Sequence, residues 1–268
     1  KERFMKKLHG SPAKSTSVII TTYNNVGALR LTMDSLACQT VKPSQVVICD
    51  DGSSSDVRDV VSRYVNFFDI VYCWQANRDF RAARSRNLGI IKSRASQVIF
   101  IDGDCMVPPR FVEFHQRIYS EKSIVYGGRV LLASSESETL MEEGIEKFNS
   151  ICAKHWKLRY LPLGILRKIT HLKWQGIKTC NLSVSSHLLR QIAGFDENYI
   201  GWGLEDSDLV ARMLRTKDIN IVNARFGGSV VHLYHEKSDR KSLSKNEALF
   251  LETLSDKLRV LPRKSVML

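Results

Sequence analysis

Two aspartates separated by a glycine, Asp102-Gly103-Asp104, follow directly after the apolar run at 98–101. Alternation along an extended chain places both carboxylates on one side, and the glycine lets a ligand approach the backbone closely. Two close carboxylates repel each other, and burying either one unpaired is costly, so we expect a divalent cation or a set of donors to neutralise them. An acidic turn without function is the alternative that this stretch alone leaves open.

The elements that position this turn alternate along the first hundred residues. We expect strands at 17–22, 45–49, 69–74 and 96–101, with a helix between each two successive strands. The first helix has Leu29, Met33 and Leu36 on one face. The second spans 55–66 with Ser54 or Ser55 as N-cap, and the third spans 81–93. This alternation predicts an α/β fold with a mostly parallel central sheet and helices on both faces.

Polar clusters lie just past three of these strands, at 21–23, 50–53 and 102–104. Ligands of parallel sheets bind beyond the carboxyl ends of the strands, so the three clusters together favour one binding site. Neither a Gly-x-Gly-x-x-Gly fingerprint nor a P-loop is present.

Composition narrows the class of protein. No apolar run of about 18 residues occurs, so we expect no transmembrane helix, and without an apolar signal core we expect a cytoplasmic protein. Because the chain starts at Lys1 without an initiator methionine, a targeting segment ahead of it stays an open alternative. The six cysteines lack Cys-x-x-Cys spacing, which favours reduced thiols over a disulfide framework or a zinc site. The net charge of +12 attracts polyanions, but the absence of nucleic-acid-binding motifs argues against a nucleic-acid partner.

The second half begins with an expected helix at 110–121 and a strand at 124–132. Residues 134–170 lose clear periodicity and contain a basic, aromatic stretch at 154–161. We consider three alternatives for this segment: a mobile acceptor loop, a contact with an anionic membrane surface, and an ordinary helix pair with a charged outer face. The basic tail at 238–268, with a helix around 244–259, either closes over a bound donor or lies against a membrane.

Two further residues indicate contacts with an acceptor. Asn181 lies inside an expected strand at 176–184, where a buried amide needs partners and a sugar hydroxyl is one candidate. Trp202 lies between two glycines, which suits a binding wall that offers a flat apolar face to a sugar. The helix expected from about 205 starts with Glu205, Asp206 and Asp208, where the helix dipole favours acids, so capping is the alternative role for them.

In this order, the stretches 19–24, 50–53, 80–89 and 102–104 resemble the landmarks of glycosyltransferase family 2. The resemblance implies the GT-A fold, with a Rossmann-like nucleotide-binding half fused to an acceptor-binding half, a nucleotide-sugar donor, and Mn²⁺ or Mg²⁺. By position it implies nucleotide contacts for Thr21, Tyr23, Asp51, Arg81, Arg86 and Asp102, and metal ligation by Asp104.

The stretch 202–206 resembles the Trp-Gly-x-Glu-Asp motif of inverting transferases, notably the β1,4-galactosyltransferase and polypeptide N-acetylgalactosaminyltransferase families. The resemblance implies that Asp206 is the general base, that Glu205 orients a substrate beside it, and that Trp202 contacts the acceptor sugar. It also implies that His235 completes the metal site, with His232 as a second ligand. Since residues three apart in a strand face different sides, both histidines ligate only if the strand has ended in a turn.

We therefore predict an inverting, metal-dependent glycosyltransferase that moves a hexose or N-acetylhexosamine from a UDP-sugar to a glycan or lipid-linked glycan, as in bacterial surface polysaccharide or lipopolysaccharide synthesis. The expected organisation is an N-terminal extension at 1–15, a nucleotide-sugar-binding half at 16–132, an acceptor-binding half at 133–237, and the basic tail. The alternatives are a sugar nucleotidyltransferase, for which 21–25 is a poor match because it lacks a glycine-rich basic loop, and a non-catalytic glycan- or nucleic-acid-binding module.

Overall fold

The computed structural model describes residues 15–54, 56–155, 158, 174–224, 227–236 and 239–267. A seven-stranded sheet with the order β3-β2-β1-β4-β8-β6-β9 forms its centre. The strands are β1 (Thr16–Thr22), β2 (Gln45–Asp50), β3 (Ile70–Trp74), β4 (Gln97–Asp102), β6 (Ser123–Tyr126), β8 (Asn181–Ser185) and β9 (Asn220–Asn223). Only β8 runs antiparallel to its neighbours, β4 and β6, within this sheet. The mostly parallel α/β sheet predicted from the sequence is therefore confirmed.

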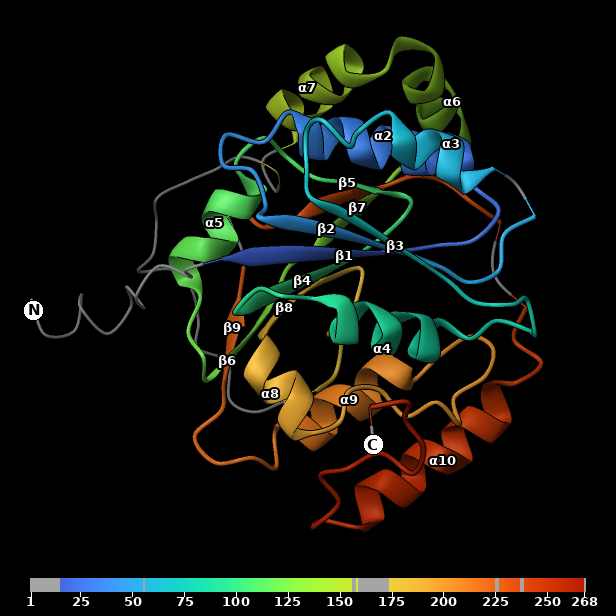
Figure 1. Cartoon of the computed structure of the whole chain (residues 1–268), viewed down its shortest axis with the longest axis vertical. Coiled ribbons are helices and arrows are strands. Elements are labelled where there is room, and N and C mark those ends of the chain that lie inside the picture. The colour runs from blue at the N-terminus through green and yellow to red at the C-terminus, as the bar shows by residue number, and fades with distance from the viewer. Residues whose placement is uncertain are drawn as a thin grey trace, which may run out of the picture.

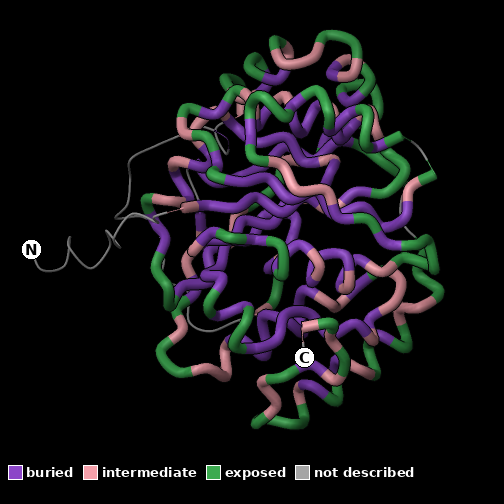
Figure 2. Tube along the Cα trace, viewed as in Figure 1, coloured by how far each residue is buried: buried purple, intermediate pink, exposed green. Residues whose placement is uncertain are grey.

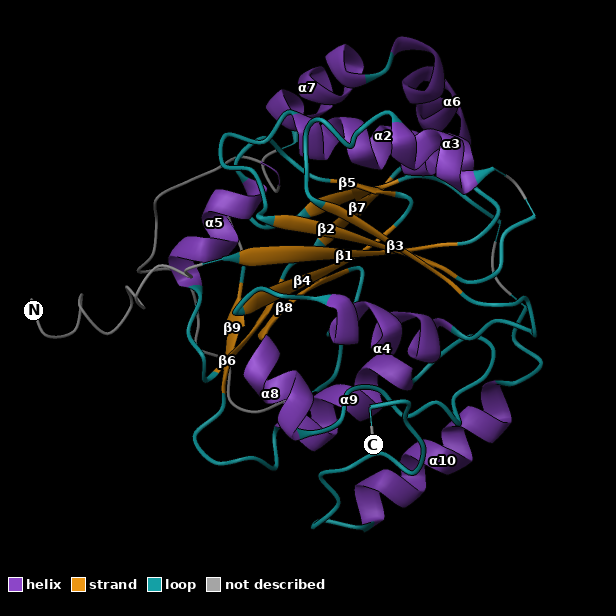
Figure 3. Ribbon diagram, viewed as in Figure 1, coloured by secondary structure: helices purple, strands orange, loops and turns teal. Residues whose placement is uncertain are grey.

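Helices cover both faces of the sheet (Figure 1). One face carries α2 (Val26–Ala37) and α3 (Val57–Ser62), and the other carries α4 (Ala82–Lys92), α8 (Ser186–Gln191) and α9 (Glu205–Met213). The outer elements are α5 (Phe111–Ile118), α6 (Ser134–Glu143), α7 (Ile145–Lys154) and α10 (Leu243–Ser255), which packs on α9. A second, three-stranded sheet joins β5 (Cys105–Met106), β10 (Val230–His232) and β7 (Arg129–Leu131), in the order β5-β10-β7. In Figure 3, β5 and β7 lie on the side of the central sheet that carries α2.

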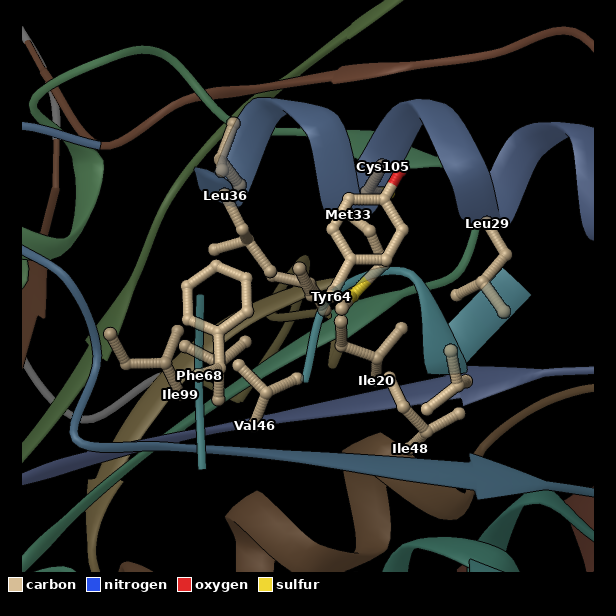
Figure 4. Close-up of a cluster of buried hydrophobic side chains, with 14 of the residues drawn as sticks. Ile20, Leu29, Met33, Leu36, Val46, Ile48, Tyr64, Phe68, Ile99 and Cys105 are labelled. Carbon is tan, nitrogen blue, oxygen red and sulfur yellow. The ribbon is translucent and has the colours of Figure 1, made fainter. Parts of the chain in front are cut away.

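The core lies on the two faces of the central strands. Between the sheet and α2, Ile20 and Ile48 pack against Leu29 and Met33, with each side chain fully buried (Figure 4). On the opposite face, Ile19 and Phe100 belong to a second buried cluster under α4, α8 and α9. Each such side chain contributes about 1.5–3 kcal/mol when it is removed from water. The central strands thus form a rigid, buried base for the loops at their ends (Figure 2).

The prediction of a single strand at 124–132 is wrong. The chain leaves the central sheet after Tyr126 and enters the small sheet at Arg129. The break lies at Gly127, where an added Cβ would lie 1.9 Å from the carbonyl oxygen of Gly228. No side chain fits this close approach of two backbones, so the glycine allows the strand to change sheets.

Other boundaries also differ from the prediction. The helix at 55–66 is shorter than expected, and its N-cap is Asp56, whose carboxylate accepts from the amide of Asp59. The strand expected at 176–184 starts only at Asn181. Residues 134–154 form the helices α6 and α7, with Leu140 and Phe148 buried beneath them. Most of the stretch at 155–173, including the aromatic part of 154–161, lies outside the described residues.

The basic tail packs against the body of the protein. Arg263 pairs with Asp196 at 3.0 Å, and Val260 and Met267 pack against the core cluster beneath α4. This packing does not support a tail that closes over the donor or lies against a membrane. Every helix within the described residues is too short or too polar to cross a bilayer.

Candidate active site

The polar clusters predicted to share a site do meet at one edge of the sheet, beyond the carboxyl ends of β1, β2 and β4. Strand register sets Thr21 beside Asp102 and Thr22 beside Asp50. The amide of Gly103 donates to the carbonyl of Thr21 at 2.8 Å, which joins the acidic turn to the end of β1. The start of α9 and the end of β10 approach the same edge, since Arg86 links Asp102 to Glu205 and Asp104 contacts two histidines.

The two aspartates after β2 have different roles. Asp50 holds its own turn, because its carboxylate accepts from Ser53 and from the hydroxyl of Tyr72 at 2.6 Å. Asp51 is almost fully buried and accepts from Gln75 and, at 2.7 Å, from the backbone amide of Arg81. Burial raises the pKa of Asp51, whereas these two hydrogen bonds oppose the rise. The structure therefore fixes Asp51 in place, and its contact with a nucleotide stays a prediction.

Three other predicted nucleotide contacts surround this turn. The hydroxyl of Thr21 is buried and has no hydrogen-bond partner among the described atoms, so it is free to bond a ligand. The ring of Tyr23 is 44% exposed, and its hydroxyl accepts from the amide of Asn77 at 3.0 Å. Arg81 donates to the carbonyl of Ala76, and its buried Nε has no partner among the described atoms.

Arg86 forms ion pairs with two carboxylates of the site. Its guanidinium lies 3.1 Å from Asp102 and 3.0 Å from Glu205, with only 5% of the side chain exposed. It also lies over the ring of Phe195 at 5.6 Å. Two carboxylates neutralise Arg86, which joins the acidic turn to the start of α9. Its buried Nε has no partner among the described atoms, and the expected nucleotide contact stays a prediction.

Glu205 is held by this link. Its side chain is 12% exposed. Burial raises the pKa of Glu205, the neighbouring Asp206 raises it further, and the charge of Arg86 opposes the rise.

Asp104 faces two imidazoles. The Nε2 atoms of His232 and His235 lie 3.7 and 3.5 Å from its two carboxylate oxygens. Each Nδ1 faces a backbone carbonyl oxygen, of Leu233 at 2.9 Å and of Glu236 at 2.6 Å. A carbonyl only accepts, so a neutral imidazole held in this way carries its proton on Nδ1 and leaves the lone pair of Nε2 for a cation beside Asp104.

This arrangement fits a divalent cation. Asp104, Cys105 and His232 offer ligand atoms that all lie within 4.8 Å of one another, and His235 approaches the other carboxylate oxygen of Asp104. Ligand atoms bound to one ion at about 2.0–2.2 Å lie about 3–3.6 Å apart, so the distances of 3.7 and 3.5 Å between Asp104 and the two imidazoles are close to the separation that one ion requires. β10 ends at His232 and the chain is irregular from Leu233 to Glu236, so the alternation of a strand no longer separates the two histidines, and ligation by both stays a prediction. The thiol of Cys105, which the sequence did not single out, also approaches Asp104 at 3.6 Å. Burial raises the pKa of this thiol well above the usual range, and the thiol would have to lose its proton to bind a metal.

The turn before α9 positions the predicted base. Leu204 adopts a left-handed conformation with φ of 74°, an uncommon geometry for a residue with a side chain. The carboxylate of Asp206, 8% exposed, accepts from the amide of Ser207 at 2.7 Å and lies 3.5 Å from the ammonium of Lys178. Lys178 was missed, because nothing in the sequence connects a turn residue before β8 with the start of α9.

Asp208, the third acid in the first turn of α9, holds the fold together. It is fully buried and pairs with Arg212 at 2.7 Å within α9. Asp208 therefore has a structural role, but as the partner of Arg212 and not as the helix cap, since no side chain among the described residues caps the start of α9.

Trp202 is partly exposed, and the guanidinium of Arg240 lies 4.8 Å from the centre of its ring. The amide of Asn246 in α10 donates to the carbonyl of Gly203 at 3.1 Å, which holds the turn. Arg240 and Asn246 come from a segment far along the chain, so no pattern in the sequence indicates either contact.

The acceptor contact expected of Asn181 is not supported. Its side chain is 1% exposed, and its amide nitrogen donates to the carbonyls of Gly128 at 2.9 Å and Gly228 at 2.6 Å. These bonds join β8 to the loops where the chain changes sheets, so Asn181 has a structural role.

Comparisons with known proteins agree with this geometry. A family model described as "Glycosyltransferase like family 2" matches residues 17–224. Validoxylamine A glucosyltransferase from Streptomyces hygroscopicus subsp. limoneus is 30% identical over 215 residues, covering 74% of this chain and 47% of the relative. Hyaluronan synthase from Pasteurella multocida is 24% identical over 219 residues, covering 74% of this chain and 22% of the relative. The chain thus spans half or less of the length of these relatives.

Solved structures show the same fold. TarS residues 1–349 from S. aureus, in complex with UDP-GlcNAc, has a TM-score of 0.63 at 15% identity, covering 90% of this chain and 67% of that one. The mannosyltransferase PcManGT from Pyrobaculum calidifontis, in complex with GDP-Man and Mn²⁺, has a TM-score of 0.60 at 15% identity, covering 95% and 70%. At this identity the likeness establishes the fold alone, and it is the GT-A fold predicted from the sequence.

Proposed function

The chain belongs to the glycosyltransferase-like family 2, and from this premise we propose that it transfers a sugar from a UDP-sugar to a hydroxyl of a glycan acceptor, with inversion and with a divalent metal. The observation that carries the proposal is the convergence on one sheet edge of the Asp102–Asp104 turn, the two histidines and Asp206, which are far apart in the sequence. The glucosyltransferase relative and the UDP-GlcNAc complex of TarS support a sugar nucleotide as donor.

The donor is proposed to bind along the ends of β1, β2 and β4. The exposed ring of Tyr23 offers a face for the base, and the unpartnered hydroxyl of Thr21 offers a hydrogen bond. Asp51 and Asp102 accept from the base and the ribose, and Arg81 offers its unpartnered Nε to the nucleotide. Asp102 is 30% exposed, so a ligand can reach its carboxylate although it is paired with Arg86.

Asp104, His232 and His235 would hold the metal ion, proposed as Mn²⁺ or Mg²⁺. When bound, the ion offsets the negative charge that develops on the departing diphosphate. The presence of two imidazoles favours manganese, because magnesium is bound in proteins mainly by oxygen ligands.

Asp206 is the proposed general base. The acceptor hydroxyl oxygen attacks the anomeric carbon from the side opposite the diphosphate, the bond from that carbon to the diphosphate oxygen breaks, and the hydroxyl proton moves to Asp206. A positioned carboxylate of this kind contributes about 10²–10⁴-fold to the rate. Glu205, fixed by Arg86, is proposed to orient the substrates beside it, and Trp202 to face the acceptor sugar.

The two alternatives are less well supported. A sugar nucleotidyltransferase does not account for the match to a glycosyltransferase family model over 17–224. A non-catalytic binding module does not account for two carboxylates, Asp104 and Asp206, that are placed to ligate a metal and to accept a proton, respectively. We propose a glycan or lipid-linked glycan of bacterial surface polysaccharide as the acceptor; a cytoplasmic location with peripheral membrane contact stays an expectation.

A thermal-shift screen of nucleotide sugars with and without MnCl₂ tests the proposal. We expect a UDP-sugar to raise the melting temperature only when manganese is present, since a ligand that binds the folded state alone stabilises it. A response to none of the nucleotide sugars, with or without metal, would refute the proposed function.

A further inference from the structure

We propose that the acceptor carries an anionic group, a carboxylate or a phosphate, near the hydroxyl that is glycosylated, and that Lys178 and Arg240 bind this group. The inference rests on the proposed function, because it uses Asp206 as the base and Trp202 as the acceptor wall. It goes further by naming the class of acceptor.

Lys178 carries the first part of the inference. Its side chain is 41% exposed, and its ammonium lies 3.5 Å from Oδ2 of Asp206. A hydroxyl that gives its proton to Asp206 must approach this carboxylate within about 2.6–3.2 Å, and so it lies beside the ammonium as well. A lysine has three donors, and one contact with Asp206 leaves the others free for the acceptor.

Arg240 carries the second part. Its guanidinium lies 4.8 Å from the centre of the Trp202 ring, and within the described part of the chain no carboxylate pairs with it. Its neighbour Asp239 pairs with Lys241 at 2.9 Å instead. Stacking on an indole uses the flat face of a guanidinium and leaves its N–H edge free, and this edge matches carboxylate and phosphate bidentately.

These two cations differ from the arginines that hold the fold. Arg86, Arg212 and Arg263 are each neutralised by carboxylates with little exposure of the guanidinium side chain. By contrast, Lys178 and Arg240 are the charged neighbours of the proposed base and the proposed acceptor wall. A neutral sugar offers these cations no charged partner, whereas a sugar with an anionic substituent does.

Ligand-observed NMR in the presence of UDP and MnCl₂ tests the inference with methyl glucuronide, glucose 6-phosphate and the neutral methyl glucoside as probes. The wild-type chain is expected to bind at least one anionic probe about 10-fold or more tightly than the glucoside, as charge-assisted hydrogen bonds imply. The two anionic probes distinguish a carboxylate from a phosphate. Lys178→Met and Arg240→Gln are each expected to remove most of this preference.

Matched controls use cations that are paired elsewhere on the surface. Lys122→Met and Arg94→Gln, whose partners are Asp218 and Asp69, are expected to keep the preference. Equal or absent binding of the anionic and neutral probes, or a preference unchanged in both site variants, overturns the inference. UDP binding measured in the same samples separates the two proposals: intact manganese-dependent UDP binding without an anionic preference refutes only the inference, and loss of UDP binding in the wild type refutes the proposed function.

Discussion

Replacing Arg86 with glutamine is expected to destabilise the fold strongly. The change keeps a polar side chain but removes the charge that neutralises Asp102 and Glu205, whose side chains are 30% and 12% exposed. Removing one partner of a buried ion pair costs about 3–5 kcal/mol, because the other charge stays buried. For a chain of this size the loss corresponds to a fall in melting temperature of about 6–20 °C.

The loss of stability should depend on pH, and the direction of this dependence follows from the pKa of Glu205. Its pKa in the folded protein is raised above the ordinary 4.5, and Arg86 opposes the rise. A carboxyl group whose pKa is higher in the folded than in the unfolded protein stabilises the fold at a pH below its unfolded-state pKa. This contribution is lost as the pH rises through its folded-state pKa. Without Arg86 the pKa of Glu205 rises further, so the deficit of Arg86→Gln should be largest near neutral pH and should shrink as the pH falls toward 4.5.

Urea unfolding at several pH values measures both effects. Arg94→Gln is the matched control, since Arg94 and Asp69 are 68% and 48% exposed and an exposed pair contributes about 1 kcal/mol at most. Adding Glu205→Gln to Arg86→Gln should restore part of the lost stability. A deficit below about 1 kcal/mol, or one that does not change with pH, would refute a role for Arg86 as the neutralising link.

Two further changes test other parts of the site. Asp104→Ala should abolish the manganese-dependent binding of UDP that calorimetry detects in the wild type. Manganese-dependent binding of equal strength in the variant would exclude Asp104 as a ligand. Asn181→Ala should lower the free energy of unfolding by about 1–3 kcal/mol, because two buried carbonyls lose their donor, and should leave the acceptor KM unchanged. A selective rise in that KM would restore Asn181 to the acceptor site.

Local patterns in the sequence predict the sheet edge well. The runs that became β1, β2 and β4 are apolar on both faces, and parallel strands place their carboxyl ends together, so Asp51, Asp102 and Asp104 could be placed at one edge. The pairing of Asp104 with His235 came from the family resemblance, because no local pattern relates positions so far apart.

Contacts between distant segments could not be predicted. Arg86 could be recognised as a cation near the site, but only the packing of α4 against α9 shows that two carboxylates neutralise it. The same holds for Asn181, which looks like a ligand-binding amide in a strand and instead bonds two backbone carbonyls. The change of sheet at Gly127 depends on the carbonyl of Gly228, about a hundred residues further along the chain.

Turnover by Asp206→Asn tests most directly whether this chain is a metal-dependent transferase with its base at the start of α9. UDP release from a UDP-sugar is measured with an acceptor in MnCl₂ and in EDTA, with donor affinity measured in parallel. Wild-type release is expected to require manganese, and Asp206→Asn should lower kcat by about 10²–10⁴-fold at unchanged donor affinity. Asp239→Asn, an exposed acid paired with Lys241, should behave as wild type. Equal turnover by Asp206→Asn, or undiminished turnover in EDTA, would contradict the proposed base or the proposed metal, respectively.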